Sequence, residues 1–278
     1  MVDQSLKGLR FPTLAATAGL EKAMRYSLLA GGKRVRPVLA LATARALGAH
    51  PERFLPAACA IELIHTYSLV HDDLPAMDDD DLRRGKPTAH VEFGEDVAIL
   101  AGDGLFAEAI RLFSEQPGEP ERVLAALREL STATGLGGMV GGQYVDVAGR
   151  AADPEALREL HALKTGRLIA AAVGVVLILE ATGEPETMAY RRFAAELGIL
   201  FQIVDDILDV TGSDEQLGKP RGSDERHGKL TYVSLFGLER ARELAAESHA
   251  RATAALSEAG GETGDLMGIA DYIFTRNE

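Results

Sequence analysis

Residues 71–85 read HDDLPAMDDDDLRRG, and they follow a long, largely apolar run. Pro75 lacks an amide donor and ends or kinks a helix, so we expect Asp72 and Asp73 at the C-terminal end of a helix. The helix dipole disfavours anions there, and the carboxylates of Asp78–Asp81 increase the repulsion. Bound cations would relieve it, and an oxygen-only ligand set suits Mg²⁺. A solvated acidic turn is the alternative for Asp78–Asp81 alone.

A second group of acids lies in the run FQIVDDILD, residues 201–209. At about 100° per residue its polar members share one face of a helix whose other face is apolar. These members are Gln202, Asp205, Asp206 and Asp209. An exposed acidic stripe is the alternative, but such stripes normally include basic residues, and none lies between Arg192 and Lys219. Because adjacent carboxylates repel one another, the pattern favours a second metal-binding group.

Short basic motifs accompany the acids along the chain. GGKRVRP, residues 31–37, places three cations on a glycine-led turn that enters a helix, which suits phosphate. Arg83 and Arg84 follow the first acid motif, KTG at 164–166 interrupts a helical pattern, and Lys219 and Lys229 come after the second acid motif. Together these motifs predict a site for two phosphorylated ligands, one bridged by metal and one held by cations alone.

His65 lies on the helix face that also carries Ile61, Ser68 and Asp72. Most histidines in apolar helices are buried core residues. Because this face ends in the predicted metal-binding aspartates, we interpret His65 as a functional residue.

The rest of the chain reads as one all-α domain that covers residues 1–278. Apolar residues make up 46% of the sequence, and they recur with a period near 3.6. We expect helices near 20–30, 36–47, 52–74, 96–115, 121–133, 154–180, 186–210, 229–257 and 265–275. Alternating runs typical of strands are absent, and glycine pairs at 31–32, 137–138 and 141–142 are expected to interrupt the helices.

Composition excludes several classes of function. The net charge of −13 argues against a nucleic-acid surface. The single cysteine, Cys59, allows no intramolecular disulfide and fits a reducing compartment. The N-terminus carries no secretory signal pattern, and we expect no membrane span and a cytoplasmic location. Walker A, dinucleotide-binding glycine, nucleophile-elbow and zinc-ligand patterns are also missing from the sequence.

Two aspartate-rich motifs, GGKRVRP before them, and KTG and GK elements in this order resemble the trans-polyprenyl diphosphate synthases. The resemblance runs from about residue 24 to the terminal DYIFTRNE, and DDLPAMDDDDLRRG is similar to the bacterial farnesyl diphosphate synthase branch. Plant-type geranylgeranyl synthases share this spacing. The resemblance implies an isoprenoid-synthase-like helical bundle around a deep central cavity, a homodimer, and three Mg²⁺ ions per active site. Val233, where the family usually has proline, departs from the pattern without removing a ligand.

The resemblance also implies roles for individual residues. Mg²⁺ and an allylic diphosphate would be bound by Asp72, Asp73 and Asp78, opposed by Asp205, Asp206 and Asp209. The allylic diphosphate would also be gripped by Arg83, Lys164, Lys219 and Lys229. Isopentenyl diphosphate would be held by Lys33, Arg36, His65 and Arg84. The catalytic positions would be Lys164, Thr165 and Gln202, the last two facing the reacting carbons.

The expected activity is a short-chain prenyl transfer that joins isopentenyl diphosphate to dimethylallyl or geranyl diphosphate and gives farnesyl diphosphate. Geranylgeranyl diphosphate is the alternative product. Ser68 lies one helical turn, about 5.4 Å, before Asp72. The resemblance to the farnesyl synthases implies that Tyr67 beside it would help to form the floor of the product channel, and ordinary core packing is the alternative for Tyr67.

Three other functions fit the sequence less well. A terpene cyclase usually lacks the second aspartate motif and GGKRVRP. A silent regulatory subunit loses aspartates that this chain keeps. A purely structural bundle leaves both acid groups unexplained.

Overall fold

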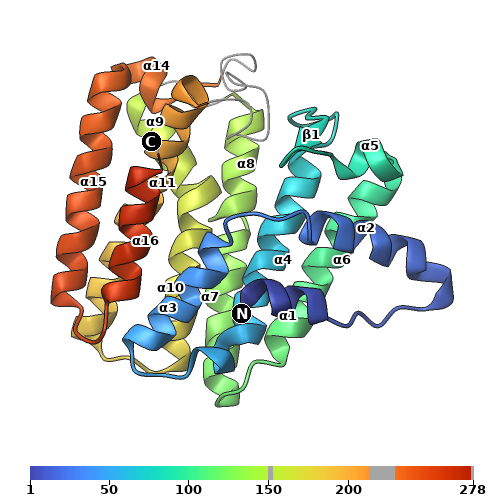
Figure 1. Cartoon of the computed structure of the whole chain (residues 1–278), viewed down its shortest axis with the longest axis horizontal. Helices are drawn as coiled ribbons and strands as arrows, with labels where there is room; N and C mark the ends of the chain where they lie inside the picture. The colour runs from blue at the N-terminus through green and yellow to red at the C-terminus, as the bar shows by residue number, and fades with distance from the viewer. Residues whose placement is uncertain (150–152, 213–228, 277–278) are drawn as a thin grey trace.

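The computed structural model describes residues 1–149, 153–212 and 229–276, and they form a bundle of helices (Figure 1). The helices are α1 (Val2–Gly8), α2 (Ala18–Leu28), α3 (Val35–Ala46), α4 (Leu55–Asp72), α5 (Ala89–Phe93), α6 (Glu95–Ser114), α7 (Pro120–Thr134), α8 (Met139–Val147), α9 (Pro154–His161), α10 (Arg167–Leu179), α11 (Glu184–Thr211), α14 (Tyr232–Phe236), α15 (Leu238–Glu258) and α16 (Gly264–Thr275). Short 3₁₀ turns are found at Ala15–Thr17 and Pro51–Phe54, and a π-helical turn at Ala162–Gly166. The expected all-α fold is confirmed.

Strand pairing in the described residues is confined to one small hairpin. β1 (Leu82–Arg83) and β2 (Lys86–Pro87) are antiparallel, with Leu82 opposite Pro87. The hairpin follows the first acid motif, and its two ends are joined because the amide of Thr88 donates to the carbonyl of Asp81 at 3.0 Å.

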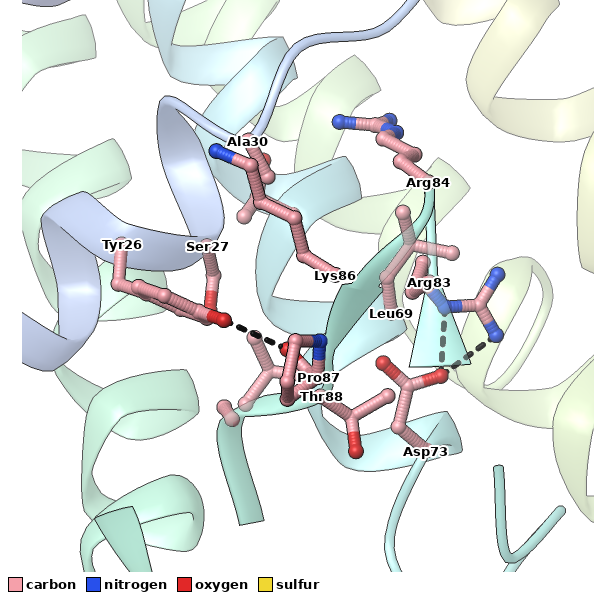
Figure 2. Close-up of a pocket in the computed structure, with 13 residues that line it drawn as sticks. Tyr26, Ser27, Ala30, Leu69, Asp73, Arg83, Arg84, Lys86, Pro87 and Thr88 are labelled. Carbon is pink, nitrogen blue, oxygen red and sulfur yellow. Dashed lines mark hydrogen bonds and ion pairs between the residues drawn. The ribbon is translucent and has the colours of Figure 1, made fainter. Parts of the chain in front are cut away.

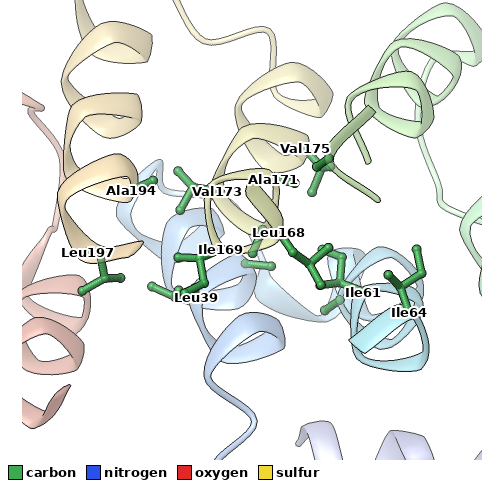
Figure 3. Packing of buried hydrophobic residues seen from close by; sticks show 14 of the residues in the cluster. Leu39, Ile61, Ile64, Leu168, Ile169, Ala171, Val173, Val175, Ala194 and Leu197 are labelled. Atoms are coloured by element: carbon green, nitrogen blue, oxygen red, sulfur yellow. The ribbon is translucent and has the colours of Figure 1, made fainter. Parts of the chain in front are cut away.

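The helix α10 lies at the centre of the core. It contacts α3, α4, α7 and α11, and Figure 3 shows its side chains beside Leu39 of α3, Ile61 and Ile64 of α4, and Leu197 of α11. Nearly every residue from Leu168 to Leu177 is buried. An apolar sequence without a polar face is stable in water only when neighbouring helices cover all of it.

The run Pro154–Leu179 is long and apolar enough to cross a membrane by length and composition alone. No membrane span is expected from the sequence. More than half of the most apolar part of this run is buried inside the bundle. Its composition is therefore explained by its central place in the core.

The long helices follow the sequence expectations, with three differences. The expected helix at 154–180 contains the π-helical turn at KTG. The expected helix at 229–257 is divided into α14 and α15 at Gly237, whose φ of 78° belongs to the left-handed region. The glycine pair at 141–142, expected to interrupt a helix, lies inside α8.

Candidate active site

The first acid motif begins where α4 ends. Asp72 is the last residue of this helix and Asp73 is its C-cap, as the sequence predicted. The chain then turns back, because the amide of Asp78 donates to the carbonyl of Asp72 at 2.9 Å. Arg83 of β1 donates to Asp73 at 2.5 Å (Figure 2) and lies 3.3 Å from Asp80.

Two lysines from later parts of the chain reach the same acids. Lys164 lies 3.8 Å from Asp72, and Lys229 donates to both carboxylate oxygens of Asp78 at 3.0 Å. Both lysines also lie near Asp146 of α8, at 2.6 Å for Lys164 and 3.6 Å for Lys229. Burial raises the pKa of Asp72, while Lys164 opposes this shift. Three of the predicted acids are therefore each held next to a predicted diphosphate-binding cation.

The second acid motif is divided by the fold. Asp205 is largely exposed and lies 3.5 Å from Arg276 near the C-terminus. Asp206 is buried, accepts hydrogen bonds from the Gln202 amide at 2.8 Å and from the backbone of Tyr232 at 2.7 Å, and so fixes the start of α14. Asp209 is also buried. These acids lie on the single continuous helix α11, so the predicted common face is retained, but Asp206 is buried against α14 whereas Asp205 stays exposed.

The π-helical turn carries Lys164 and Thr165 and is clamped between two helices. A Cβ added at Gly142 of α8 would lie 2.3 Å from the amide nitrogen of Lys164, and one at Gly198 of α11 would lie 2.9 Å from the Cα of Gly166. Glycine permits this close approach on both sides. The hydroxyl of Thr165 consequently reaches the carbonyl oxygen of the Gln202 side chain at 3.2 Å.

A cavity of about 410 Å³ opens between α4, α8 and the π-helical turn. One end is polar and includes Asp72, Lys164 and Thr165, while Tyr67, Met139 and Val140 contribute apolar wall. The full lining is Arg36, His65, Tyr67, Ser68, Leu69, His71, Asp72, Met77, Met139, Val140, Gln143, Tyr144, Val147, Lys164 and Thr165. The predicted cavity is therefore found, and it joins charged groups to an apolar interior.

The cations predicted for the second ligand meet near the start of α3. Arg36 is buried and lines the cavity together with His65. Burial, Arg36 and Arg84 lower the pKa of His65 well below its ordinary value, so this imidazole is neutral at neutral pH. Burial and the nearby Arg276 lower the pKa of Lys33. Arg84 donates to the carbonyl of Gly31, which links the hairpin to the glycine-led turn.

Arg34 departs from the expectation for GGKRVRP. Its guanidinium is buried, donates to Glu62 at 2.6 Å and to the carbonyl of Leu28 at 2.8 Å, and pairs with Asp3 at 3.0 Å. A buried charge needs such partners, so Arg34 fixes the loop and is not one of the cations presented to a ligand.

Magnesium fits the donor chemistry without a preformed cage. The described residues contain no group of three or more acidic, histidine or cysteine side chains placed to hold a metal. Mg²⁺ typically binds one or two carboxylates and completes its shell with water and substrate phosphates. The carboxylate of Asp72 in the cavity wall and that of Asp78, whose amide is hydrogen-bonded to the Asp72 carbonyl, fit that requirement. Lys219 lies outside the described residues.

Sequence reasoning missed three contributors. Asp146 and Gln143 follow the glycine pair that was expected to break a helix, and three-residue spacing inside a recognised helix would have placed them on one face. Arg276 stacks on the Phe201 ring at 4.3 Å and donates to its carbonyl at 3.0 Å. No local pattern around Arg276 signals this contact.

Comparison with known proteins identifies the family. The model of the polyprenyl synthetase family matches residues 17–263. The chain belongs to the polyprenyl synthetase family. Over 267 residues it is 46% identical to geranylgeranyl pyrophosphate synthase 11 of Arabidopsis thaliana, and the aligned region covers 93% of this chain and 75% of the relative. Over 235 residues it is 49% identical to farnesyl diphosphate synthase of Geobacillus stearothermophilus, covering 83% of this chain and 79% of the relative.

Solved structures agree with this membership. A geranyltransferase of Helicobacter pylori, complexed with magnesium and isoprenyl diphosphate, has a TM-score of 0.88 and 32% identity, with coverage of 99% and 93% of the two chains. The protein is a short-chain prenyltransferase. The polyprenyl synthetase match extends over both acid motifs and the GGKRVRP motif, so the purely structural alternative is set aside.

Proposed function

We propose that this polyprenyl synthetase condenses isopentenyl diphosphate with dimethylallyl or geranyl diphosphate and releases farnesyl diphosphate and diphosphate. The observation that carries the proposal is the cavity at the end of α4, which has Asp72 and Lys164 in its polar lining and Tyr67 in its apolar wall. In this reaction the allylic C–O bond breaks, a new C–C bond forms to isopentenyl diphosphate, and the departing diphosphate takes the proton that is lost.

We also propose a dependence on three Mg²⁺ ions held by Asp72, Asp73 and Asp78, with Asp205, Asp206 and Asp209 on the opposing side. Magnesium would neutralise the charge of the leaving diphosphate. The related structure that contains magnesium and isoprenyl diphosphate supports the dependence on magnesium. Asp206 can serve as a metal ligand only if its hydrogen bonds to Gln202 and Tyr232 are kept or exchanged.

The chain's own cations divide into two groups that match two diphosphates. Arg83, Lys164 and Lys229 lie against the first acid motif and would bind the allylic diphosphate, together with Lys219. Lys33, Arg36, His65 and Arg84 would hold isopentenyl diphosphate. Partly buried cations stabilise a leaving anion more strongly than fully exposed ones would.

Thr165 and Gln202 are placed by their mutual hydrogen bond beside Lys164. In the proposed reaction their oxygen atoms face the allylic carbocation, and the apolar wall of the cavity keeps water from it. Neutral His65 acts as a hydrogen-bonding group and adds no further positive charge to the crowded basic group.

Farnesyl diphosphate is the proposed main product because the bulky Tyr67 lies in the cavity wall close to the end of α4. Its ring packs edge-on against Phe106 at 5.3 Å and against His71 at 5.9 Å, which restricts its movement. Geranylgeranyl diphosphate is the second candidate, since the Arabidopsis relative carries that name.

A homodimer is proposed as well. Two stripes of exposed apolar side chains support it, and both lie beside the cavity. Ile99 and Phe106 belong to the stripe on α6, and Val140, Tyr144 and Val147 belong to the stripe on α8.

The experiment is an incubation of the purified protein with labelled isopentenyl diphosphate and each allylic primer, with Mg²⁺ or with excess chelator. Chromatographic sizing of the products should show a C15 compound with Mg²⁺ and no product with chelator. A dominant C20 product would overturn the farnesyl assignment, cyclised hydrocarbons would indicate a terpene cyclase, and full turnover with chelator would overturn the metal assignment.

A further inference from the structure

We propose that Asp146 is a positioning residue that holds Lys229 together with Lys164, which lines the cavity, ready for the allylic diphosphate. The inference rests on the proposed function, since it concerns the same diphosphate site. Asp146 belongs to neither aspartate-rich motif. It lies on α8, and its side chain is only 12% exposed.

The geometry makes Asp146 the anion that the two lysines share. Its Oδ2 atom lies 2.6 Å from the Nζ of Lys164 and 3.6 Å from the Nζ of Lys229. Each lysine reaches a different acid on its other side, Asp72 for Lys164 and Asp78 for Lys229. Two cations on flexible stems repel each other, and a carboxylate between them lowers that repulsion and reduces their freedom.

The contacts of the two lysines with Asp72 and Asp78 would be affected by substrate binding differently from their contacts with Asp146. Metal ions that take the oxygens of Asp72 and Asp78 compete with the lysines for the same carboxylates. Asp146 is not among the proposed metal ligands, so its contact with both lysines can persist. The lysines would then stay in place with their remaining donors directed toward the diphosphate.

The position of α8 is fixed independently of any ligand. Gly142, one turn before Asp146, packs directly against the backbone of Lys164, where an added Cβ would lie 2.3 Å from the amide nitrogen. This contact sets the distance between the two side chains. Although burial opposes ionisation, Lys164 and Lys229 hold the pKa of Asp146 below its ordinary value, so the carboxylate is charged at neutral pH.

The test is the Asp146→Asn variant, which keeps the shape of the side chain and removes its charge. Calorimetric titration with inorganic diphosphate in the presence of Mg²⁺ should show about tenfold weaker binding, the size expected for losing a charge-assisted contact. The KM for geranyl diphosphate should rise by a similar factor, while the KM for isopentenyl diphosphate stays within about twofold of wild type.

The matched control is Glu129→Gln, which removes a carboxylate that pairs with Arg191 at 2.7 Å between α7 and α11. Glu129 pairs with Arg191 and, among the described residues, with neither Lys164 nor Lys229, so this variant should bind diphosphate as the wild type does. A second variant, Asp146→Glu, keeps the charge and should bind diphosphate more tightly than Asp146→Asn. This ordering separates positioning by charge from simple loss of packing.

A double-mutant cycle gives the decisive readout. In a Lys164→Met, Lys229→Met background, Asp146→Asn should weaken diphosphate binding by less than about twofold, because the groups that it positions are gone. The inference is overturned if wild type binds diphosphate and Asp146→Asn binds equally well, or if the loss is the same in both backgrounds. Failure of the wild type itself to bind diphosphate would instead overturn the proposed function, and this inference with it.

Discussion

Tyr67 and Ser68 are neighbours on α4, and both line the cavity. Replacing Tyr67 by alanine removes the ring that Phe106 and His71 restrain, so a growing chain can extend further before it meets the wall. We expect Tyr67→Ala to give C20 or longer products and Ser68→Phe to shorten the main product toward C10, as measured by chromatographic sizing. Tyr67→Phe, which keeps the ring, should retain the wild-type product. Unchanged product distributions in active Tyr67→Ala and Ser68→Phe proteins would show that α4 does not set the length.

His161, at the end of α9, is a second residue whose environment has a measurable effect, in this case on the pH dependence of the free energy of unfolding. Its Nδ1 atom is buried and has no hydrogen-bond partner among the described residues. Burial lowers the pKa of His161 to about 4; Asp146 opposes this shift and Lys164 adds to it. Between about pH 4 and the ordinary histidine value near 6.5, the unfolded chain therefore binds a proton that the folded chain excludes. This histidine makes the free energy of unfolding fall as the pH drops through that window.

We expect His161→Gln to lose less stability than wild type between pH 7.5 and pH 5, since the substituted side chain does not titrate. Urea midpoints at both pH values measure the difference. His50→Gln, at an exposed position, serves as the control and should follow the wild type. An identical loss in His161→Gln and wild type would contradict the assigned role of this imidazole.

At the scale of elements, the site depends on the close packing of α8 against the π-helical turn. An alanine at Gly142 would place a methyl group against the backbone of Lys164, which cannot move aside like a flexible side chain. We expect Gly142→Ala to lower the free energy of unfolding by about 2 kcal/mol, as overpacking does, and to reduce kcat through displacement of Lys164 and Thr165. Denaturant unfolding and steady-state kinetics measure the two effects.

Gly268→Ala on α16 is the matched control. A Cβ at this helical position meets no neighbouring atom within 4 Å. Alanine should therefore raise the free energy of unfolding by about 0.5 kcal/mol, because glycine weakens helix interiors. Equal effects of the two substitutions would contradict the close packing of α8 against the π-helical turn.

The packing of α8 also shows which elements sequence patterns could predict and which they could not. Long periodic helices such as α4 and α11 were found near their expected ranges, because their apolar faces are read directly from spacing. The helix α8 was missed, since Gly141 and Gly142 were read as an interruption. Helix propensity alone cannot distinguish a glycine that breaks a helix from one that permits close packing.

The candidate site shows the corresponding limit for side chains. The C-terminal position of Asp72 on α4 followed from Pro75. The inward turn of Arg34 did not, because it depends on Glu62, a buried partner in a different helix. Likewise Asp206 looks equivalent to Asp205 in sequence, and only the packing of α14 distinguishes them.

At the scale of the whole molecule, one end of the bundle gathers groups that are distant in the chain. Lys229 meets Asp78, and Lys164 meets Asp72. Motif order predicted that such groups belong to one site, whereas which cation meets which acid depends on tertiary packing. The apolar part of the cavity lies between α4 and α8, and exposed apolar residues flank it on both sides.

Those exposed residues lead to the prediction of a dimer. On α6, Ile99 and Phe106 are 44% and 40% exposed, and on α8 Val140, Tyr144 and Val147 form a stripe at helical spacing with exposures of 45%, 59% and 56%. Contiguous apolar surface of this kind is normally covered by a partner. A second copy would shield both stripes and close the cavity wall that Tyr144 and Val147 leave open to solvent.

Light scattering coupled to size-exclusion chromatography should therefore give a mass of about twice the 29.6 kDa of the chain. Ile99→Asp places a charge on the α6 stripe without changing a cavity-lining side chain, and it should shift the protein toward the monomer. The control is Leu124→Asp on α7, whose side chain is 58% exposed and lies on neither stripe, so the dimer should persist. A monomeric wild-type protein would contradict the dimer. A dimer in which Ile99→Asp has no effect would place the interface on another face of the bundle.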